Sequence, residues 1–228
     1  SEARLRANQM PKVKPKLIDQ NFEIIRWYSK VLSRQTTEQQ LKILAGQNSF
    51  AGQLALTAYY LQQGDEDNAQ QALDQAKKHN QIHPLLVLFQ TDIYLGKNQL
   101  EPALRSVRSA ASIMPENRAL NYKYAEVLIR MKQTDQAKMI VQRFLNANSR
   151  DLSAWRLMLS ATNAEPASEI KTINVLRYRA EMEYWTGNEE AAIKSLLHAQ
   201  RVSKKNQSLS ASISQRLKQM QQERKYKI

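Results

Sequence analysis

The chain has 228 residues, 42% of them hydrophobic, and no cysteine, which excludes a disulfide, a thiolate metal site and a cysteine nucleophile. Its 34 basic and 21 acidic residues give a net charge of +13, so nucleic acid, anionic membranes and acidic protein surfaces are all candidate partners. Only 5 glycines and 6 prolines are present, which favours helices over many short strands.

Apolar residues are not gathered into a run that could cross a membrane. The longest clear run is 85–89 (LLVLF), far short of the roughly 20 residues that a spanning helix needs. Residues 1–10 carry charges throughout and include no apolar stretch, so they do not resemble a signal peptide. We therefore predict no transmembrane segment and expect any export signal to precede Ser1.

The first helices are expected at residues 19–33 and 37–47, which together form a degenerate first pair (19–47). Three units with a fixed period follow, at residues 50–82, 84–115 and 118–148. The period is marked by alanines that recur at intervals of 34 residues, each at the same place in a turn followed by a helix: Ala69, Ala103 and Ala137. A period of 34 residues is that of the tetratricopeptide repeat, a pair of antiparallel helices.

The residue types around these alanines fit such a helix pair. Two helices approach closely only where side chains are small, so alanine is expected at the crossing point. Glycine in the turn tolerates left-handed dihedrals, and an N-cap residue begins the second helix. The expected turn glycines are Gly64, Gly96 and Gly187, and the expected N-caps are Asp65, Thr134 and Asn188.

The strict period fails after the third unit, since Lys171 stands 34 residues beyond Ala137. Helices are expected at 151–161 and 170–185, and the second is shared between an irregular unit (151–186) and a last unit (170–203). A polar capping helix at 207–225 closes the array, because a terminal unit must present one face to water. The predicted fold class is all-α: a tetratricopeptide-repeat superhelix, an α-solenoid of antiparallel helix pairs, over residues 16–228.

Several segments of the chain carry a resemblance to one family. They are residues 3–10 (ARLRANQM), 92–99 (DIYLGKNQ) and 187–192 (GNEEAA), together with the tryptophan of the irregular unit in 153–155 (SAW). Over nearly its whole length the chain resembles the C-terminal repeat region of the periplasmic β-barrel assembly-enhancing proteases. These are bacterial zinc metalloproteases that quality-control outer-membrane protein assembly.

This resemblance implies a function and a location. The chain would be the substrate- and partner-docking module of such a protease in the periplasm, with residues 1–15 as the end of the upstream protease domain or a linker. The His-Glu-x-x-His motif and its zinc would lie in that upstream domain. The implied partners are the outer-membrane assembly machinery or an unfolded β-barrel substrate.

No catalytic residue is predicted in this chain, because none of His79, His83 and His198 is followed by glutamate. We therefore expect these residues not to form an enzyme by themselves and to hold no cofactor and no metal. His79 and His83 are four residues apart, which on one helix would resemble half of a metal site. Pro84 follows directly, so a frayed helix end with exposed histidines is the preferred interpretation.

Aromatic and basic residues alternate at 177–179 (RYR), a pattern that also occurs where bases stack beside phosphate contacts. Tyrosines spread over a repeat array are more simply explained as core, so no nucleic-acid partner is predicted.

Basic residues gather at 12–16 and 216–227, where a solvated helix face is the preferred interpretation. The alternative function is a free-standing adaptor or a nucleic-acid-binding helical repeat protein.

A protein-binding groove is predicted on the first helix of each unit, because these helices line the concave face of a superhelix. Its mix of apolar and charged side chains would hold an extended or helical polypeptide segment. The repeat register gives as groove residues Leu54, Ala58, Leu61, Leu88, Asp92, Leu95, Tyr122, Glu126, Ile129, Arg177, Glu181 and Tyr184.

Overall fold

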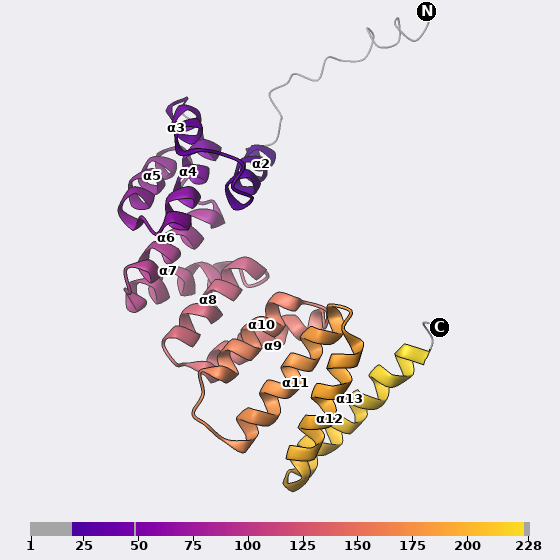
Figure 1. Cartoon of the computed structure of the whole chain (residues 1–228). Coiled ribbons are helices and arrows are strands. Elements are labelled where there is room, and N and C mark those ends of the chain that lie inside the picture. The colour runs from indigo at the N-terminus through magenta and orange to yellow at the C-terminus, as the bar shows by residue number, and fades with distance from the viewer. Residues whose placement is uncertain (1–19, 48, 226–228) are drawn as a thin grey trace, which may run out of the picture. The chain divides into compact units, whose positions relative to one another are not determined.

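The computed structural model describes residues 20–47 and 49–225 (Figure 1). This part of the chain contains twelve α-helices and one short 3₁₀ helix, and no β-strand. The predicted all-α fold is therefore confirmed. The predicted linker at 1–15, the family-like segment at 3–10 and the basic cluster at 12–16 lie outside the described residues.

The chain divides into two compact units, residues 1–97 and 98–228, and each is considered by itself. The boundary falls between the two helices that the sequence predicts as the repeat 84–115. The extent of the repeat domain, 16–228, and the limits of its individual units stay predictions.

Five helices form the described part of the first unit, with α4 at its centre. They are α2 (Gln20–Leu32), α3 (Glu38–Gly46), α4 (Phe50–Gln63), α5 (Glu66–His79) and α6 (Pro84–Gly96). Helix α4 contacts all four of the others, so it is buried on most of its sides. Its apolar side chains make the core of this unit together with Val31, Leu41 and Leu73.

Seven α-helices form the second unit, and each contacts its successor in the chain. They are α7 (Leu100–Ile113), α8 (Arg118–Arg130), α9 (Thr134–Ala147), α10 (Leu152–Asn163), α11 (Glu169–Trp185), α12 (Glu189–Val202) and α13 (Gln207–Lys225), with the 3₁₀ helix η2 (Ser203–Lys205) before α13. One core lies among α8, α9 and α10, and another among α11, α12 and α13. Helix α11 contacts both α10 and α12, as each inner helix of this unit contacts its two chain neighbours, and its sharing by two repeat units stays a prediction.

The alanines that define the 34-residue period lie in the core, on the second helix of each pair. Ala69, Ala103, Ala137 and Ala192 each have 0% of their surface exposed. Four residues later, on the same helix face, a larger apolar side chain is buried in each case: Leu73, Val107, Val141 and Leu196. The burial predicted from the period is therefore confirmed.

The turns place a left-handed residue at the same point of successive units. Gly64 (φ 73°), Asn98 (φ 55°) and Lys132 (φ 61°) follow one another at the repeat spacing, and Gly187 (φ 88°) serves the last pair. Gly64 and Gly187 have the predicted left-handed dihedrals, whereas Gly96 lies beside the turn as the last residue of α6 and is not left-handed. Asn98 takes that role instead, because asparagine tolerates left-handed dihedrals better than most residues.

Two of the three predicted N-caps are confirmed. The side chains of Asp65 and Asn188 accept hydrogen bonds of 3.0 and 3.3 Å from the backbone N–H three residues later. Thr134 is wrong as a cap, since it is the first residue of α9. Gln133 holds the cap position there and makes no side-chain cap bond.

The closing helix α13 is not polar on all sides. Ile213, Leu217 and Met220 are buried in the core that it shares with α11 and α12. Spacings of three and four residues put these side chains on one face, so α13 covers the end of the apolar array. None of the described helices is long and apolar enough to cross a membrane.

Candidate protein-binding surfaces

In the first unit, half of the predicted groove residues lie in the core. Leu54, Ala58 and Leu95 are buried, and they cannot contact a partner in this structure. The physical reason for Leu54 and Ala58 is that α2 and α3 pack on α4 in addition to α5 and α6, which leaves little of α4 exposed. The remaining three predicted residues are half-buried: Leu61, Leu88 and Asp92.

In the second unit, the predicted groove residues of α8 share one half-buried face: Tyr122, Glu126 and Ile129. The Glu126 side chain is 35% exposed, and it accepts ion pairs from Lys123 Nζ at 2.7 Å and from Arg130 Nη2 at 3.4 Å. Glu126 is therefore held in place on α8 yet stays accessible to a partner.

Tyr122 takes part in a hydrogen-bond cluster that joins α8 to the start of α10. Its hydroxyl donates to Asp151 Oδ2 at 2.8 Å, and Arg118 Nη1 donates to the same oxygen at 3.0 Å. The other carboxylate oxygen of Asp151 caps α10 by accepting the backbone N–H groups of Ser153 and Ala154 at 3.0 and 3.1 Å. Tyr122 thus stabilises the fold, whatever it contributes to binding.

Burial favours the neutral form of both acidic groups of this cluster, Tyr122 and Asp151, but their net pKa shifts are opposite. Burial raises the pKa of Tyr122, and its hydrogen bond to Asp151 raises it further. For Asp151 burial also favours the neutral form, but the hydrogen bonds from Tyr122 and from two backbone N–H groups, together with the charge of Arg118, lower the pKa below its usual value. The carboxylate is consequently a strong acceptor at neutral pH.

The last set of predicted groove residues, on α11, is covered by the closing helix. Arg216 of α13 donates to both carboxylate oxygens of Glu181, at 2.7 and 2.8 Å, and its guanidinium lies 5.1 Å from the ring centroid of Tyr184. Tyr184 is buried and donates to Glu223, and Arg177 donates to α13 at Ser212. These contacts correct two predictions. Glu181 and Tyr184 hold α13 on α11, Arg177 stays a groove prediction, and Arg216 is not part of a solvated basic face.

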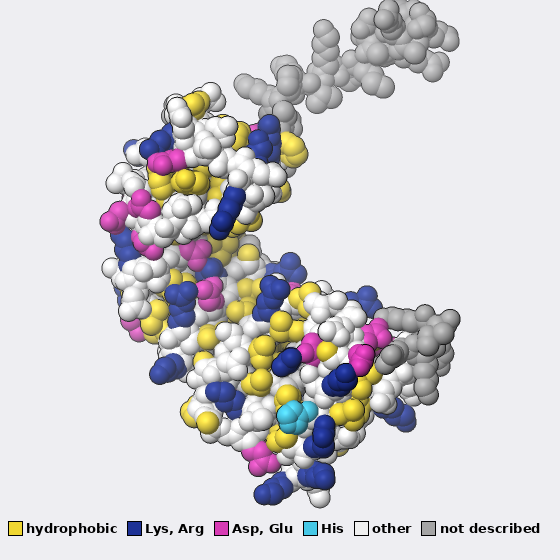
Figure 2. Space-filling view, in the orientation of Figure 1, with side chains coloured by type: hydrophobic (Ala, Val, Ile, Leu, Met, Phe, Trp, Pro, Cys, Tyr) yellow, Lys and Arg dark blue, Asp and Glu magenta, His cyan; other side chains and the backbone are white. Residues whose placement is uncertain are grey.

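Basic side chains are spread over the face of the molecule in Figure 2, with acidic side chains between them. Within single helices, basic residues of the chain form ion pairs, such as Arg179 with Glu183 at 2.8 Å on α11 and Lys194 with Glu190 at 2.6 Å on α12. The Lys194–Glu190 pair is exposed on both sides, and exposed pairs of this kind contribute little to stability and are screened by salt. On the face shown, net charge therefore does not mark one binding surface.

The two neighbouring histidines lie on different elements. His79 is the exposed last residue of α5, whereas His83 is the half-buried N-cap of α6. His83 Nδ1 accepts the Leu85 N–H at 3.3 Å, and its ring packs edge-on against Phe50 with centroids 5.5 Å apart. The expectation that both are exposed is wrong for His83. Among the described residues no group of three metal-binding side chains occurs.

We expect His83→Ala to lower the free energy of unfolding by about 1 to 2 kcal/mol, because it removes the cap hydrogen bond and the ring contact. His79→Ala should be neutral. Burial lowers the pKa of His83, so below pH about 6.5 the unfolded chain binds more protons than the folded one. Stability should then fall as the pH drops from about 6.5 towards the lower folded-state pKa.

Urea titrations at neutral and mildly acidic pH would check both statements about the cap. His83→Asn is the matched control, since asparagine can cap the helix but does not titrate in this range. Its stability should depend on pH less than that of the unmodified chain. Equal losses for His79→Ala and His83→Ala would contradict the assignment.

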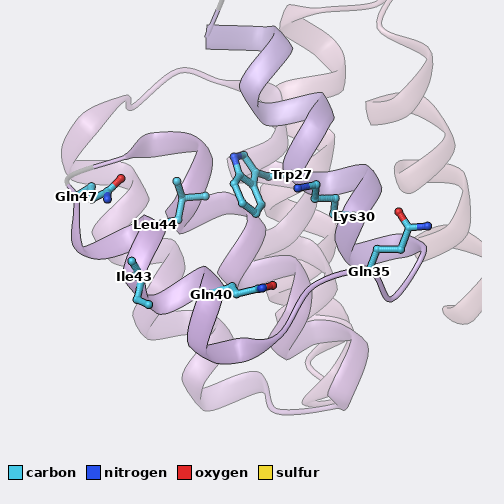
Figure 3. A pocket seen from close by; sticks show the side chains of 7 residues that line it. All are labelled: Trp27, Lys30, Gln35, Gln40, Ile43, Leu44 and Gln47. Carbon is cyan, nitrogen blue, oxygen red and sulfur yellow. The ribbon is translucent and has the colours of Figure 1, made fainter.

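A hollow of about 390 Å³ lies between α2 and α3 (Figure 3). Trp27 and Lys30 line it from α2, Gln35 from the connection between the two helices, and the other lining residues from α3 and its end. Trp27 Nε1 donates to Glu23 at 3.1 Å, which orients the indole, and Lys30 Nζ lies 4.4 Å from the centroid of the Trp27 ring. The remaining lining residues are Gln40, Ile43, Leu44 and Gln47.

One wall of this hollow belongs to a helix that packs closely on Gly52 of α4. A Cβ atom at Gly52 would lie 2.9 Å from Ala45 N and from two carbon atoms of Leu44, closer than real side chains come. Glycine therefore lets α3 pack directly against α4. Because Leu44 also lines the hollow, the same close approach places one of its walls.

We expect Gly52→Ala to destabilise the first unit by about 1 to 3 kcal/mol, since overpacking forces α3 away from α4. In an open helix the same change would stabilise by roughly 0.5 to 1 kcal/mol. Gly46→Ala in α3 is the matched control, because a Cβ there meets nothing within 4 Å. Thermal melts of both variants would decide, and a rise in the midpoint for Gly52→Ala would contradict the packing.

Sequence reasoning missed this hollow, because it sought binding residues in the periodic units and gave the degenerate first pair no role. One signal was present in the sequence. Trp27 and Lys30 are three residues apart, which puts them on one helix face. Helix α3 has an exposed Ile43 beside its buried apolar residues, and such exposure is only visible once the packing on α4 is known.

Residues 94–161 match the family model of the tetratricopeptide repeat. This span includes the pair α8 and α9, whose crossing point is the fully buried Ala137. Tetratricopeptide repeats form scaffolds for protein–protein interaction, so the matched part of the chain is of that kind.

Known proteins are similar to the chain in sequence and in structure. Over 91 residues it is 33% identical to an N-terminal acetyltransferase A complex subunit-like protein of Schizosaccharomyces pombe, a stretch that covers 40% of this chain and only 13% of that protein. A solved structure, described as the functional characterisation of Pseudomonas aeruginosa pilF, superposes with a TM-score of 0.56 at 17% identity. The superposition covers 92% of this chain and 99% of that one, and at this identity it shows the fold alone.

Proposed function

We propose that this chain is the substrate- and partner-docking module of a periplasmic zinc metalloprotease that acts in the quality control of outer-membrane protein assembly. The resemblance of residues 92–99 and 187–192 to that family supports the proposal. In the fold these segments contain two of the turns with a left-handed residue, at Asn98 and Gly187. The zinc and the catalytic residues belong to the upstream domain in this proposal.

The observation that carries the docking role is the face of α8 within the span that matches the repeat family. Glu126 is accessible there and lies between two cations, Lys123 and Arg130. A polypeptide on this face meets both charges as well as the aliphatic surface of Ile129. This combination suits an extended segment with polar and apolar side chains, such as an unfolded β-barrel strand.

Site-specific photo-cross-linking in cells that produce the full-length protein tests the proposal. A photoreactive residue replaces Glu126 on α8 in one variant and Met139 on α9 in the control. Met139 is 67% exposed, so the control is at least as accessible to passing proteins.

The expected result is a cross-link from position 126, and not from 139, to a β-barrel protein or to a component of the outer-membrane assembly machinery. Cross-links from 139 alone would place docking on the opposite helix of the pair. Cross-links from 126 only to cytoplasmic proteins or to nucleic acid would instead favour a free-standing adaptor.

A further inference from the structure

We propose that the hollow between α2 and α3 binds a peptide segment in which an apolar residue stands next to an acidic residue. This site lies on the degenerate first pair and not on the α8 face. The inference goes beyond the proposed function, because it rests on the lining of the hollow and not on a protease context.

Apolar surface is available on both walls of the hollow. The indole of Trp27 faces the space from α2, and Leu44 and Ile43 face it from α3 (Figure 3). Ile43 is 61% exposed although its neighbours Leu41 and Ala45 are buried. An apolar side chain placed between these groups would remove their surface from water, which is the main source of affinity in such pockets.

Carboxamides line the rest of the hollow, at Gln35, Gln40 and Gln47. Each offers both a donor and an acceptor, as a peptide group does. The oxygen of Gln40 already accepts the Thr37 N–H and the Thr36 hydroxyl, both at 3.2 Å. Its NH₂ group can then donate to a peptide carbonyl, so the wall suits a backbone as well as a side chain.

The positive charge of Lys30 favours a peptide with an acidic residue next to the bound apolar residue. Lys30 is its one charged lining residue, and it forms no ion pair with the described part of the chain. Glu23, the carboxylate nearest along α2, is held by Arg26 and Trp27 and does not line the space. A carboxylate beside the bound apolar group would therefore complement the ammonium of Lys30 without competing with an acid of the protein.

The size of the hollow limits the segment to a few residues. Its volume of about 390 Å³ lies near the lower end of the range for ligand pockets, about 300 to 1,000 Å³. Both walls belong to helices that pack on α4, so the site is formed by the fold of the first unit. An apolar residue with its acidic neighbour fits this space, whereas a whole helix does not.

The indole N–H signals of the chain's three tryptophans allow a direct test by NMR. The probe is a blocked hexapeptide of serine, glycine, leucine, glutamate, glycine and serine, added to the complete chain. Its matched versions carry glutamine for glutamate or alanine for leucine. Trp155, which donates to Ser149 at 2.8 Å, and Trp185 of α11 are internal references.

We expect a saturable shift of the Trp27 signal alone, with weaker binding of both altered peptides. Lys30→Gln should weaken the glutamate peptide by about two- to five-fold, the usual range for an exposed charge pair, and leave the glutamine peptide unchanged. Ile43→Ser should weaken the binding of the glutamate peptide and of the glutamine peptide. Ile113→Ser is the control, since Ile113 is 76% exposed but belongs to the second unit.

Three results would overturn the proposal. They are an unmoved Trp27 signal at millimolar peptide, equal binding of the glutamate peptide to the Lys30→Gln variant, and the same shift from inorganic phosphate alone. None of them bears on cross-linking from position 126, which lies in the other unit. Failure of this site and failure of the proposed function can therefore be told apart.

Discussion

Asp151→Ala is expected to lower the free energy of unfolding of the second unit by about 2 to 4 kcal/mol. The variant removes the N-cap of α10 and the acceptor of two charge-assisted or buried hydrogen bonds, from Arg118 and Tyr122. The Tyr122 hydroxyl would be left without this acceptor while it is still half-buried. Urea denaturation followed by circular dichroism measures the loss.

Asp151→Asn is the matched control, because asparagine keeps the shape and one cap acceptor while it removes the charge. It should lose less than Asp151→Ala. The lowered pKa of Asp151 also gives a pH test. A carboxyl group with a depressed folded-state pKa stabilises the fold above its unfolded value near 3.8, and this stabilisation is lost as the pH falls through the folded pKa.

The asparagine variant should lack this part of the acid dependence. If Asp151→Ala and Asp151→Asn were equally stable, and both close to the unmodified chain, the cluster around Asp151 would not be holding α8 to α10.

Ala137→Leu is expected to destabilise the second unit by about 1 to 3 kcal/mol. Ala137 has no exposed surface and lies in the core with Ala125 and Leu128 of the neighbouring helix. A leucine there adds three carbon atoms to a packed crossing point, so α8 and α9 must separate or adopt strained rotamers. The urea midpoint should fall while the dependence on urea concentration stays the same.

Ala119→Leu makes the same substitution at an exposed position of α8 and should be close to neutral. A midpoint that falls equally in both variants would show that leucine acts through something other than the crossing point. An unchanged midpoint for Ala137→Leu would mean that the 34-residue register does not mark the contact between the two helices.

Much of the fold could be predicted because the repeat is encoded by small residues at fixed intervals. Close helix contact requires a small residue at Ala69 and Ala137, and left-handed turns favour glycine at Gly64 and Gly187. At these positions the residue type therefore indicates the structural role. The turn at Asn98 was missed because a left-handed residue favours glycine without requiring it. Lys132 occupies the same place in the next unit, where composition gives no signal at all.

The binding residues could be predicted less well, since the repeat register says which residues face a neighbour and not what covers them. Leu54 lies in the core because the degenerate first pair packs on α4. Glu181 pairs with Arg216 across 35 residues of sequence, a contact that no local pattern indicates. The hollow beside Trp27 likewise arises only when α2 and α3 are both placed on α4.

The most direct test of the docking role is a titration of a labelled, unfolded outer-membrane β-barrel protein with the chain, followed by fluorescence anisotropy at low and at physiological salt. The comparison needs the unmodified chain, Glu126→Ala on the face of α8, and Met139→Ala on the exposed side of α9. We predict saturable binding at both salts that Glu126→Ala weakens by about five-fold or more, as expected for a residue worth at least 1 kcal/mol at an interface, and that Met139→Ala leaves unchanged. Absence of saturable binding, or a loss in Met139→Ala with none in Glu126→Ala, would contradict the account.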